Sequence, residues 1–507
     1  MVLRIEMPKT NFKVIKFFQE NKFLIMILVI GVLLRSFKPL QLFMYSHDQD
    51  LAGWVIKDIL VNKHLRLIGQ ETTSQGVFIG PLFYYLQIPF YLLTNMDPSG
   101  TILLVTLLGI FTIFSFYFCF SKIFDKKVGL IAAFIYSVCL YFVFTDREIA
   151  PTMPVHLWTV WFLYSIWMIL IGKSKAYILL GLLVGVIWNF NLALAIIVPL
   201  VLVAQVRSKT KIGLKNVVIG AAVFLITMSP FFAFEARHSF RQTKAIVYSL
   251  VSSKDYVPGT GRGLAKLDRV FQLVHKNVSS IFWGEFKPIP NSYTFYLLVI
   301  SFILLVVKKV IPADLGLILA LWVAVYIVFF TANTINLSEY YLNGMNVVWI
   351  TTLSVGFDFL LKKNIYLKRL AIFLLILFTV LSFYSLFTKA INRSGYIERK
   401  AIVKYIKEDA KDKGYPCVSV SYITSPGNEL GYRYLFWLQG MHVNQPSSMS
   451  PVYTIVFPHS KVDRIDKSFG ALGLVLPDYE RYNKKEVDIS CSGENSNLTD
   501  PMFGYTQ

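Results

Sequence analysis

The chain has 507 residues, of which 55% are hydrophobic and only 16% are charged, and its formal net charge is +20. Soluble domains carry about 25% charged residues, so this composition, with a mean hydropathy of +0.55, excludes an ordinary soluble domain and predicts an integral membrane protein. The positive charge does not indicate nucleic acid binding, because the lysines and arginines occur in short clusters between apolar runs, a pattern that membrane topology explains.

Eleven apolar runs approach the length of about 20 residues that a membrane-spanning helix needs. They cover residues 23–42, 101–121, 128–145, 154–172, 176–190, 191–206, 215–234, 293–309, 314–331, 341–360 and 368–387. The fifth and sixth share one run that is broken only at 188–191, and a single long helix there would reverse the orientation of everything downstream. The Lys-rich start precedes a full-length run without a small-residue cleavage site, so we expect the first span to remain as an anchor.

The basic residues fit one topology, with the N-terminus inside. All the inside segments are then basic: the start of the chain, 121–127, 172–175, 207–215, 308–314 and 361–369. The outside segments are 43–100, 146–153, a tight turn near Asn189, 235–292, 332–340 and everything after 388. This assignment requires the short segment 81–93, with Pro81 and Pro89, to lie along the membrane surface rather than to cross it.

The pattern changes after residue 387, which divides the chain into a transmembrane domain, 1–387, with external loops 43–100 and 235–292, and a C-terminal domain, 388–507. The second domain has alternating stretches and a charged helical pattern, so we expect a small extracytoplasmic α/β domain. Cys417 and Cys491 both lie in it. Either a disulfide or two free thiols is compatible with the sequence, depending on the compartment.

Two acids follow the first apolar run, where the chain should leave the bilayer. Asp48 and Asp50 lie in the segment 46–60, whose apolar residues have helical spacing. Ionisable groups at a membrane boundary are costly unless they face water, a cavity or a partner. Both are therefore candidates for a catalytic acid or base. The alternative is that they cap an ordinary surface helix.

The same segment carries a family resemblance. SHDQDLAGWVIKDIL at 46–60, followed by GPLFYYLQIPFYLL at 80–93, resembles the first external loop of polyprenyl-phosphate-dependent glycosyltransferases with the GT-C fold, such as dolichyl-phosphate-mannose protein mannosyltransferases and aminoarabinose transferases. In that family an acidic residue precedes a helix ending in a basic-acidic-apolar-Leu run, which implies that Asp48 is the catalytic aspartate and that Gln49 replaces the usual second acid. Further likeness lies in SKIFDKKVGLIAAFIYS, in SPFFAFEARHSF and in the pair Tyr340 and Tyr341, which are candidate substrate contacts.

The chemistry of sugar transfer from a lipid phosphate to a hydroxyl requires a base for the acceptor and stabilisation of the departing phosphate. Asp48 suits the base, because a carboxylate near apolar surface has a raised pKa. Direct displacement by the acceptor inverts the anomeric centre and needs only one base.

The second outside loop offers further acids. Related enzymes often place a carboxylate where this chain has Thr152, and Asp146 or Glu148 can substitute for it, with Arg147 between them as a substrate-binding residue. The alternative is that the nearby prolines begin the next helix and the charges are interfacial.

The third candidate segment begins the outside loop 235–292. Arg237 and Arg241 lie four residues apart, so they can share a helix face and hold a phosphate through their guanidinium groups. His238 is a further candidate for substrate binding. Glu235 and His238 are also candidate ligands of a divalent metal ion, which similar enzymes sometimes have. Anchoring of lipid headgroups by the arginines is the alternative.

These observations predict a polytopic α-helical, GT-C-like protein with about 11 transmembrane helices and a small C-terminal α/β domain. We expect a hexosyl- or pentosyltransferase that moves a sugar, with inversion, from a polyprenyl-phosphate donor to a glycan, lipid or protein acceptor outside the cell membrane. The alternative function is a non-catalytic transporter or flippase of lipid-linked glycans, which should place its essential polar groups near the bilayer midplane. No Walker loop, dinucleotide fingerprint or zinc-type spacing occurs, so apart from a divalent metal ion no cofactor is expected.

Overall fold

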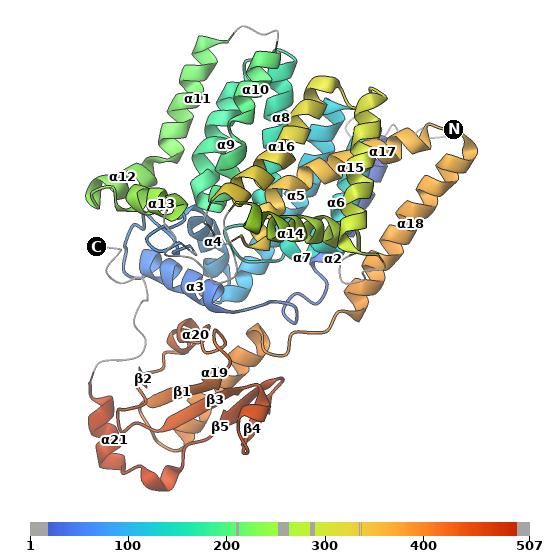
Figure 1. Ribbon diagram of the computed structural model, residues 1–507. Coiled ribbons are helices and arrows are strands. Elements are labelled where there is room, and N and C mark those ends of the chain that lie inside the picture. The colour runs from blue at the N-terminus through green and yellow to red at the C-terminus, as the bar shows by residue number, and fades with distance from the viewer. Residues whose placement is uncertain are drawn as a thin grey trace, which may run out of the picture.

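The computed structural model describes residues 19–72, 74–208, 212–251, 263–283, 289–333, 335 and 337–493. A helical bundle forms the larger part, and a sheet domain lies beyond one end of it (Figure 1). The helices of the larger part are α2 (Lys22–Arg35), α3 (His47–Leu60), α4 (Leu82–Leu93), η1 (Pro98–Gly100), α5 (Thr101–Ile123), α6 (Lys126–Val138), α7 (Leu140–Thr145), α8 (Val155–Leu170), α9 (Ala176–Phe190), η2 (Leu192–Ile197), α10 (Leu200–Arg207), α11 (Leu214–Thr227), α12 (Ser229–Arg237), α13 (Arg241–Val251), α14 (Leu264–Trp283), α15 (Asn291–Val307), α16 (Ala313–Ala332), η3 (Glu339–Met345), α17 (Asn346–Leu361) and α18 (Ile365–Thr388).

Helices occupy all the predicted apolar runs, which confirms a polytopic helical membrane protein, but their lengths do not establish how many cross. Among the described residues, four helices are long and apolar enough by themselves, and a fifth is the pair α11 and α12, bent by 54°. The four are Pro98–Ile123, Ala313–Ala332, Glu339–Leu361 and Ile365–Thr388. The predicted run 128–145 is interrupted, because Cys139 has an extended backbone between α6 and α7.

The doubtful break between the fifth and sixth runs is present. Helix α9 ends at Phe190, and Asn191 is extended, with its side-chain oxygen accepting a hydrogen bond from the Ala193 backbone N–H at 3.0 Å. Tyr177 at the start of α9 donates a hydrogen bond to Gln205 near the end of α10. The chain therefore turns back after α9, as the predicted turn near Asn189 requires.

The segment 81–93 forms a short helix, as its predicted place along the membrane surface requires. Helix α4 has 12 residues, which corresponds to about 18 Å and is too short for a hydrocarbon core of about 30 Å. It lies beside α3, at the end of the bundle that faces the sheet domain (Figure 1).

The C-terminal domain is α/β, as predicted. Its elements are α19 (Tyr396–Asp412), β1 (Val418–Thr424), α20 (Arg433–Leu438), β2 (Val443–Asn444), β3 (Val452–Phe457), η4 (His459–Lys461), β4 (Lys467–Phe469), β5 (Leu472–Val475), η5 (Tyr479–Arg481) and α21 (Lys484–Cys491). The sheet order is β2-β1-β3-β5-β4, with β1 parallel to β2 and β3, and β5 antiparallel to β3 and β4. Buried apolar residues of α19, among them Ile402 and Ile406, pack with those of the strands into one core.

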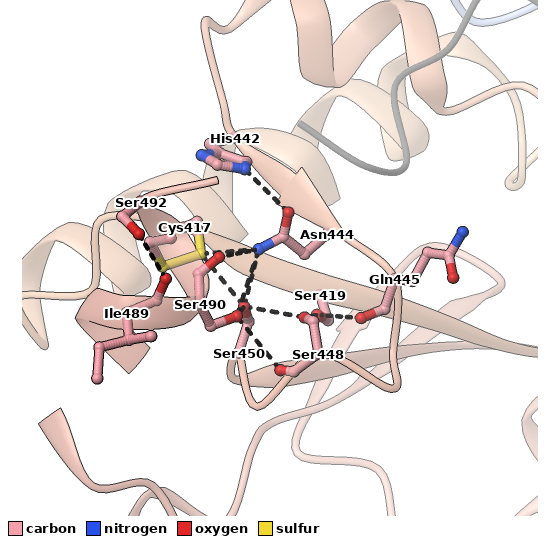
Figure 2. Close-up of a disulfide and its surroundings, with 11 residues drawn as sticks. Cys417, Ser419, His442, Asn444, Gln445, Ser448, Ser450, Ile489, Ser490 and Ser492 are labelled. Carbon is pink, nitrogen blue, oxygen red and sulfur yellow. Dashed lines mark hydrogen bonds between the residues drawn. A yellow bond between two sulfur atoms is a disulfide. The ribbon is translucent and has the colours of Figure 1, made fainter. Parts of the chain in front are cut away.

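A disulfide closes this domain. Cys417, just before β1, is bonded to Cys491 at the end of α21, with their Cα atoms 5.5 Å apart. Figure 2 shows the hydroxyl groups that gather beside it: the Oγ atoms of Ser450 and Ser490 are 2.7 Å apart, and Asn444 Nδ2 donates to the Ser490 carbonyl at 3.0 Å. The disulfide and this network hold α21 against the sheet. Cys119 and Cys139, which lie in predicted spans, are free and buried.

Candidate active site

A cavity of about 1150 Å³ lies where the predicted outside segments meet. Each of these segments contributes to its wall, for example through Asp48, Glu148, Asn191, Ser249, Tyr340 and Lys389. No described residue of the predicted inside segments lines it. Segments that are far apart in the sequence therefore converge at one end of the bundle.

The carboxylate of Asp48 lies in this cavity, half-buried in the first turn of α3. Among the described residues, it has no hydrogen-bond or ion-pair partner. The helix does not need it as a cap, because Gln49 Oε1 accepts a hydrogen bond from the Ser46 backbone N–H at 2.9 Å. Gln49 Nε2 also donates to the Ile149 carbonyl at 2.9 Å, which ties α3 to the second outside loop.

Glu148 provides the second acid of the cavity. Protein atoms around it and the negative charge of Asp48 raise the pKa of the Glu148 carboxyl above its usual value. The two acids therefore interact, although they come from loops 100 residues apart in the sequence.

Two cations line the same cavity, Arg147 and Lys389. Arg147 Nη2 donates to the Phe37 carbonyl at 2.8 Å, just after α2, and burial lowers the pKa of its guanidinium to about 10, which still leaves it protonated at neutral pH. Lys389 follows α18, and its Nζ lies 5.3 Å from the centre of the Phe144 ring. The cavity thus combines acids, cations and apolar walls.

Two candidate catalytic acids, Asp50 and Asp146, lie outside the cavity, and their contacts do not favour a catalytic role. Asp146 is buried, and Oδ2 accepts hydrogen bonds from Arg35 Nε at 2.8 Å and Nη2 at 2.6 Å. Asp50 Oδ1 accepts from the Tyr434 backbone N–H at 3.0 Å and from the Tyr45 hydroxyl at 3.2 Å. Both carboxylates hold elements together, and neither is positioned to meet a substrate in the cavity.

The third candidate segment also lies apart from the cavity wall. Arg237 is exposed at the end of α12, and neither it nor His238 nor Arg241 lines the cavity. Glu235 is buried and accepts hydrogen bonds from the backbone N–H groups of Gln242 at 3.0 Å and Thr243 at 2.9 Å, which caps α13.

A metal site at Glu235 and His238 remains a prediction that these contacts do not favour. Both oxygens of Glu235 are occupied by backbone N–H groups, and His238 Nδ1 lies 2.8 Å from the Phe234 carbonyl oxygen. The described part of the chain holds no group of three His, Cys, Asp or Glu side chains that could bind an ion. No step below depends on a metal.

Tyr340 and Tyr341, by contrast, line the cavity as a candidate substrate surface requires, with ring centres 4.4 Å apart. Sequence reasoning missed Lys389, although its place directly after the last apolar run could have revealed it. It also missed Tyr141, which donates a hydrogen bond to Asn343 in the cavity wall. Tyr141 lies inside an apolar run, where nothing in the sequence distinguishes it from a packed aromatic residue.

Residues 79–234 match the family model of dolichyl-phosphate-mannose-protein mannosyltransferase. Among solved structures, ArnT from Cupriavidus metallidurans bound to undecaprenyl phosphate is similar with a TM-score of 0.59 and 10% identity, over 91% of this chain and 99% of that chain. The apo state of the same protein gives a TM-score of 0.59 and 11% identity, over 92% of this chain and 99% of that chain. For an oligosaccharyltransferase from Archaeoglobus fulgidus in complex with Zn and sulfate, the TM-score is 0.49 and the sequence identity is 14%. The match covers 86% of this chain and 67% of that chain. No curated protein matches this sequence. The family model thus matches part of the chain, from residue 79 onward, and the two ArnT structures share the fold of the chain.

Proposed function

We propose, from the GT-C fold that this chain shares with polyprenyl-phosphate-dependent glycosyltransferases, that it transfers a sugar from a polyprenyl phosphate to an acceptor at the outer face of a membrane. The observation that carries the proposal is the carboxylate of Asp48, which lies without a partner among the described residues in a cavity that also holds two cations. A structural carboxylate at a helix start is normally engaged by backbone or cations. This one is left available to a substrate.

Asp48 acts as the general base of a direct displacement. It accepts the proton of the acceptor hydroxyl while the acceptor oxygen bonds to the anomeric carbon, and the bond from that carbon to the phosphate oxygen breaks. The electron pair of the broken bond leaves with the polyprenyl phosphate. Because the acceptor attacks the anomeric carbon from the side opposite to the leaving phosphate, the anomeric centre is inverted. Glu148 is the alternative base, since its raised pKa suits proton transfer.

Arg147 and Lys389 stabilise the departing phosphate. Both are cations in the wall of the cavity, and charge that develops on a leaving phosphate is stabilised best by groups already held in place. The backbone carbonyls that bind Arg147 provide that constraint. Apolar residues of the same wall, such as Phe329 and Phe330, suit the isoprenoid chain. ArnT, which shares the fold, is bound to undecaprenyl phosphate.

The test is to incubate the purified protein with a panel of polyprenyl-phosphate sugars and candidate acceptors, and to measure released polyprenyl phosphate. At least one sugar lipid should be converted by the wild type, and D48N should not convert it. If no sugar lipid is cleaved but the protein moves one between the leaflets of proteoliposomes, the transporter alternative is correct.

The same proposal includes the topology, with a cytoplasmic N-terminus and an extracytoplasmic C-terminal domain. It is supported by the basic inside segments, by the convergence of the outside segments on one cavity, and by the disulfide between Cys417 and Cys491, which suits an oxidising compartment. A reporter that is active only in the cytoplasm, fused after Gln507, should be silent. Activity of that reporter would contradict the topology.

A further inference from the structure

The first turn of α3 is held from the side opposite to the cavity by the C-terminal domain. Figure 1 shows α20 of that domain directly facing α3. Asp50 is 5% exposed, and its Oδ1 accepts the backbone N–H of Tyr434 in α20 at 3.0 Å. The two residues are 384 positions apart in the sequence, so this contact exists only in the folded arrangement of both domains.

The ring of Tyr434 also fixes the distance between α3 and α20. It packs against Gly53, one turn further along α3, so closely that a Cβ atom there would lie 2.6 Å from Tyr434 Cγ. The Tyr434 hydroxyl donates to the Met96 carbonyl at 2.7 Å. A glycine at position 53 is therefore required by the close approach of the two helices.

Helix geometry connects this contact to the active site. Successive residues of an α-helix are rotated by about 100°, so Asp48 and Asp50 point about 200° apart, to nearly opposite sides of α3. The rotation of α3 that brings Asp50 to Tyr434 is the same rotation that turns Asp48 into the cavity. The hydrogen bond from Gln49 to the Ile149 carbonyl supports this rotation from the second outside loop.

The hydrogen bond between Asp50 and Tyr434 requires the burial of a carboxyl group, which is unfavourable. Burial raises the pKa of the Asp50 carboxyl to about 7, whereas an apolar side chain would join two surfaces without that penalty. A buried polar contact of this kind defines one geometry, because a shifted helix would leave the carboxylate and the Tyr434 N–H unpaired.

We propose that the C-terminal domain is a positioning element for the catalytic base: Asp50, Gly53 and Tyr434 set the rotation of α3 that aims Asp48 at the acceptor. This inference rests on the proposed function of Asp48. Asp50 is a positioning residue, not a catalytic one, since it lies outside the cavity.

The experiment compares D50A, D50N and I455V with the wild type in the donor assay. D50A removes the acceptor for the Tyr434 N–H and should lower kcat roughly 10- to 100-fold, as small misplacements of a catalytic group do, while the KM for the sugar lipid stays unchanged. D50N keeps an oxygen for that N–H, so it should restore most of kcat. I455V is the control, because Ile455 is buried in β3 and belongs to a hydrophobic cluster that includes neither Tyr434 nor any residue of α3. It should destabilise the C-terminal domain while the hydrogen bond between Asp50 and Tyr434 is kept, and its folded fraction should keep the wild-type kcat.

A wild-type kcat in D50A, or an equal loss in D50A and I455V at matched folded fraction, would overturn the positioning role. A loss in D50N as complete as in D48N would make Asp50 itself the base. If D48N is fully active, the proposed function of Asp48 fails, and the positioning role fails with it. If D48N is inactive while D50A is active, only the positioning role fails.

Discussion

The first turn of α3 and the junction between α12 and α13 both carry carboxylates at the start of a helix, but the contacts of these carboxylates differ. In α3 the cap is made by Ser46 and Gln49, and Asp48 is left in the cavity. At the junction Glu235 itself caps α13, with both oxygens on backbone N–H groups. An acid at a helix start is thus a site candidate only when another residue satisfies the backbone.

The cations of the two regions also differ in whether they line the cavity. Arg237 lies exposed on the outside of the junction, whereas Arg147 and Lys389 line the cavity near Asp48 and Glu148. Charge at the outer face is not enough to bind a donor phosphate in the reaction geometry. In the proposed mechanism, the cation must also lie in the same cavity as Asp48.

The largest expected effect is that of D48N. An amide keeps the size of the side chain but cannot accept a proton at neutral pH, so the transfer rate should fall about 10²–10⁴-fold at unchanged expression and melting temperature. E235Q, which changes a buried carboxylate in the other region, is the matched control and should keep its turnover in the folded fraction. Near-normal turnover in D48N would shift the role of base to Glu148.

The next effect concerns the donor phosphate. R147A or K389A should weaken binding of the sugar lipid roughly 10- to 100-fold, because each removes a charge-assisted contact of about 1.5–3 kcal/mol. Since the Arg147 guanidinium also binds carbonyls after α2, the melting temperature of each variant is measured beside its donor affinity. Donor affinity can be measured by calorimetry with protein in detergent, and unchanged affinity in K389A would remove Lys389 from the site.

The sequence predicted most of this architecture because hydrophobic length and basic clusters report directly on membrane crossing. Asp48 could be singled out from the sequence because a local motif surrounds it. The contacts of Asp50, Asp146 and Glu235 could not be predicted in this way. Their partners are fixed by tertiary packing or by a turn, which residue types do not reveal. These partners are Tyr434, Arg35 and Gln242, respectively. Lys389 enters the cavity only because α18 ends there.

A smaller effect is expected on stability when the cap of α13 is removed. E235A leaves the backbone N–H groups of Gln242 and Thr243 without their acceptors and should cost about 0.5–2 kcal/mol of unfolding free energy. The turnover of the folded fraction should not change. Thermal unfolding in detergent and activity at matched folded protein distinguish this structural role from a catalytic one, for which turnover would fall while stability stayed constant.

The buried Asp50 should make stability depend on pH in a defined direction. Its pKa is raised to about 7 in the folded chain by burial, above the usual value of about 4, so folding favours the protonated form and ionised Asp50 costs stability. This cost is absent at low pH, grows as pH rises between about 4 and 7, and is complete above 7. The melting temperature of D50N relative to wild type should therefore be higher at pH 8 than at pH 5. An equal difference at both pH values would show that burial does not shift the pKa.

The smallest effect is expected for Arg237 and Arg241, and it tests the sequence-based assignment directly. That assignment makes both arginines ligands of the donor phosphate, and it predicts weaker donor binding in R237A and R241A with only partial restoration by Lys. The structure favours the opposite outcome, because neither side chain lines the cavity that holds Asp48. We expect donor affinity within about twofold of wild type for both Ala variants, as for surface charges in general, measured beside K389A in the same preparation. A tenfold loss in either variant would mean that the donor headgroup extends beyond the cavity to α12 and α13, and the contrast between the two regions would then be one of position along a single donor site.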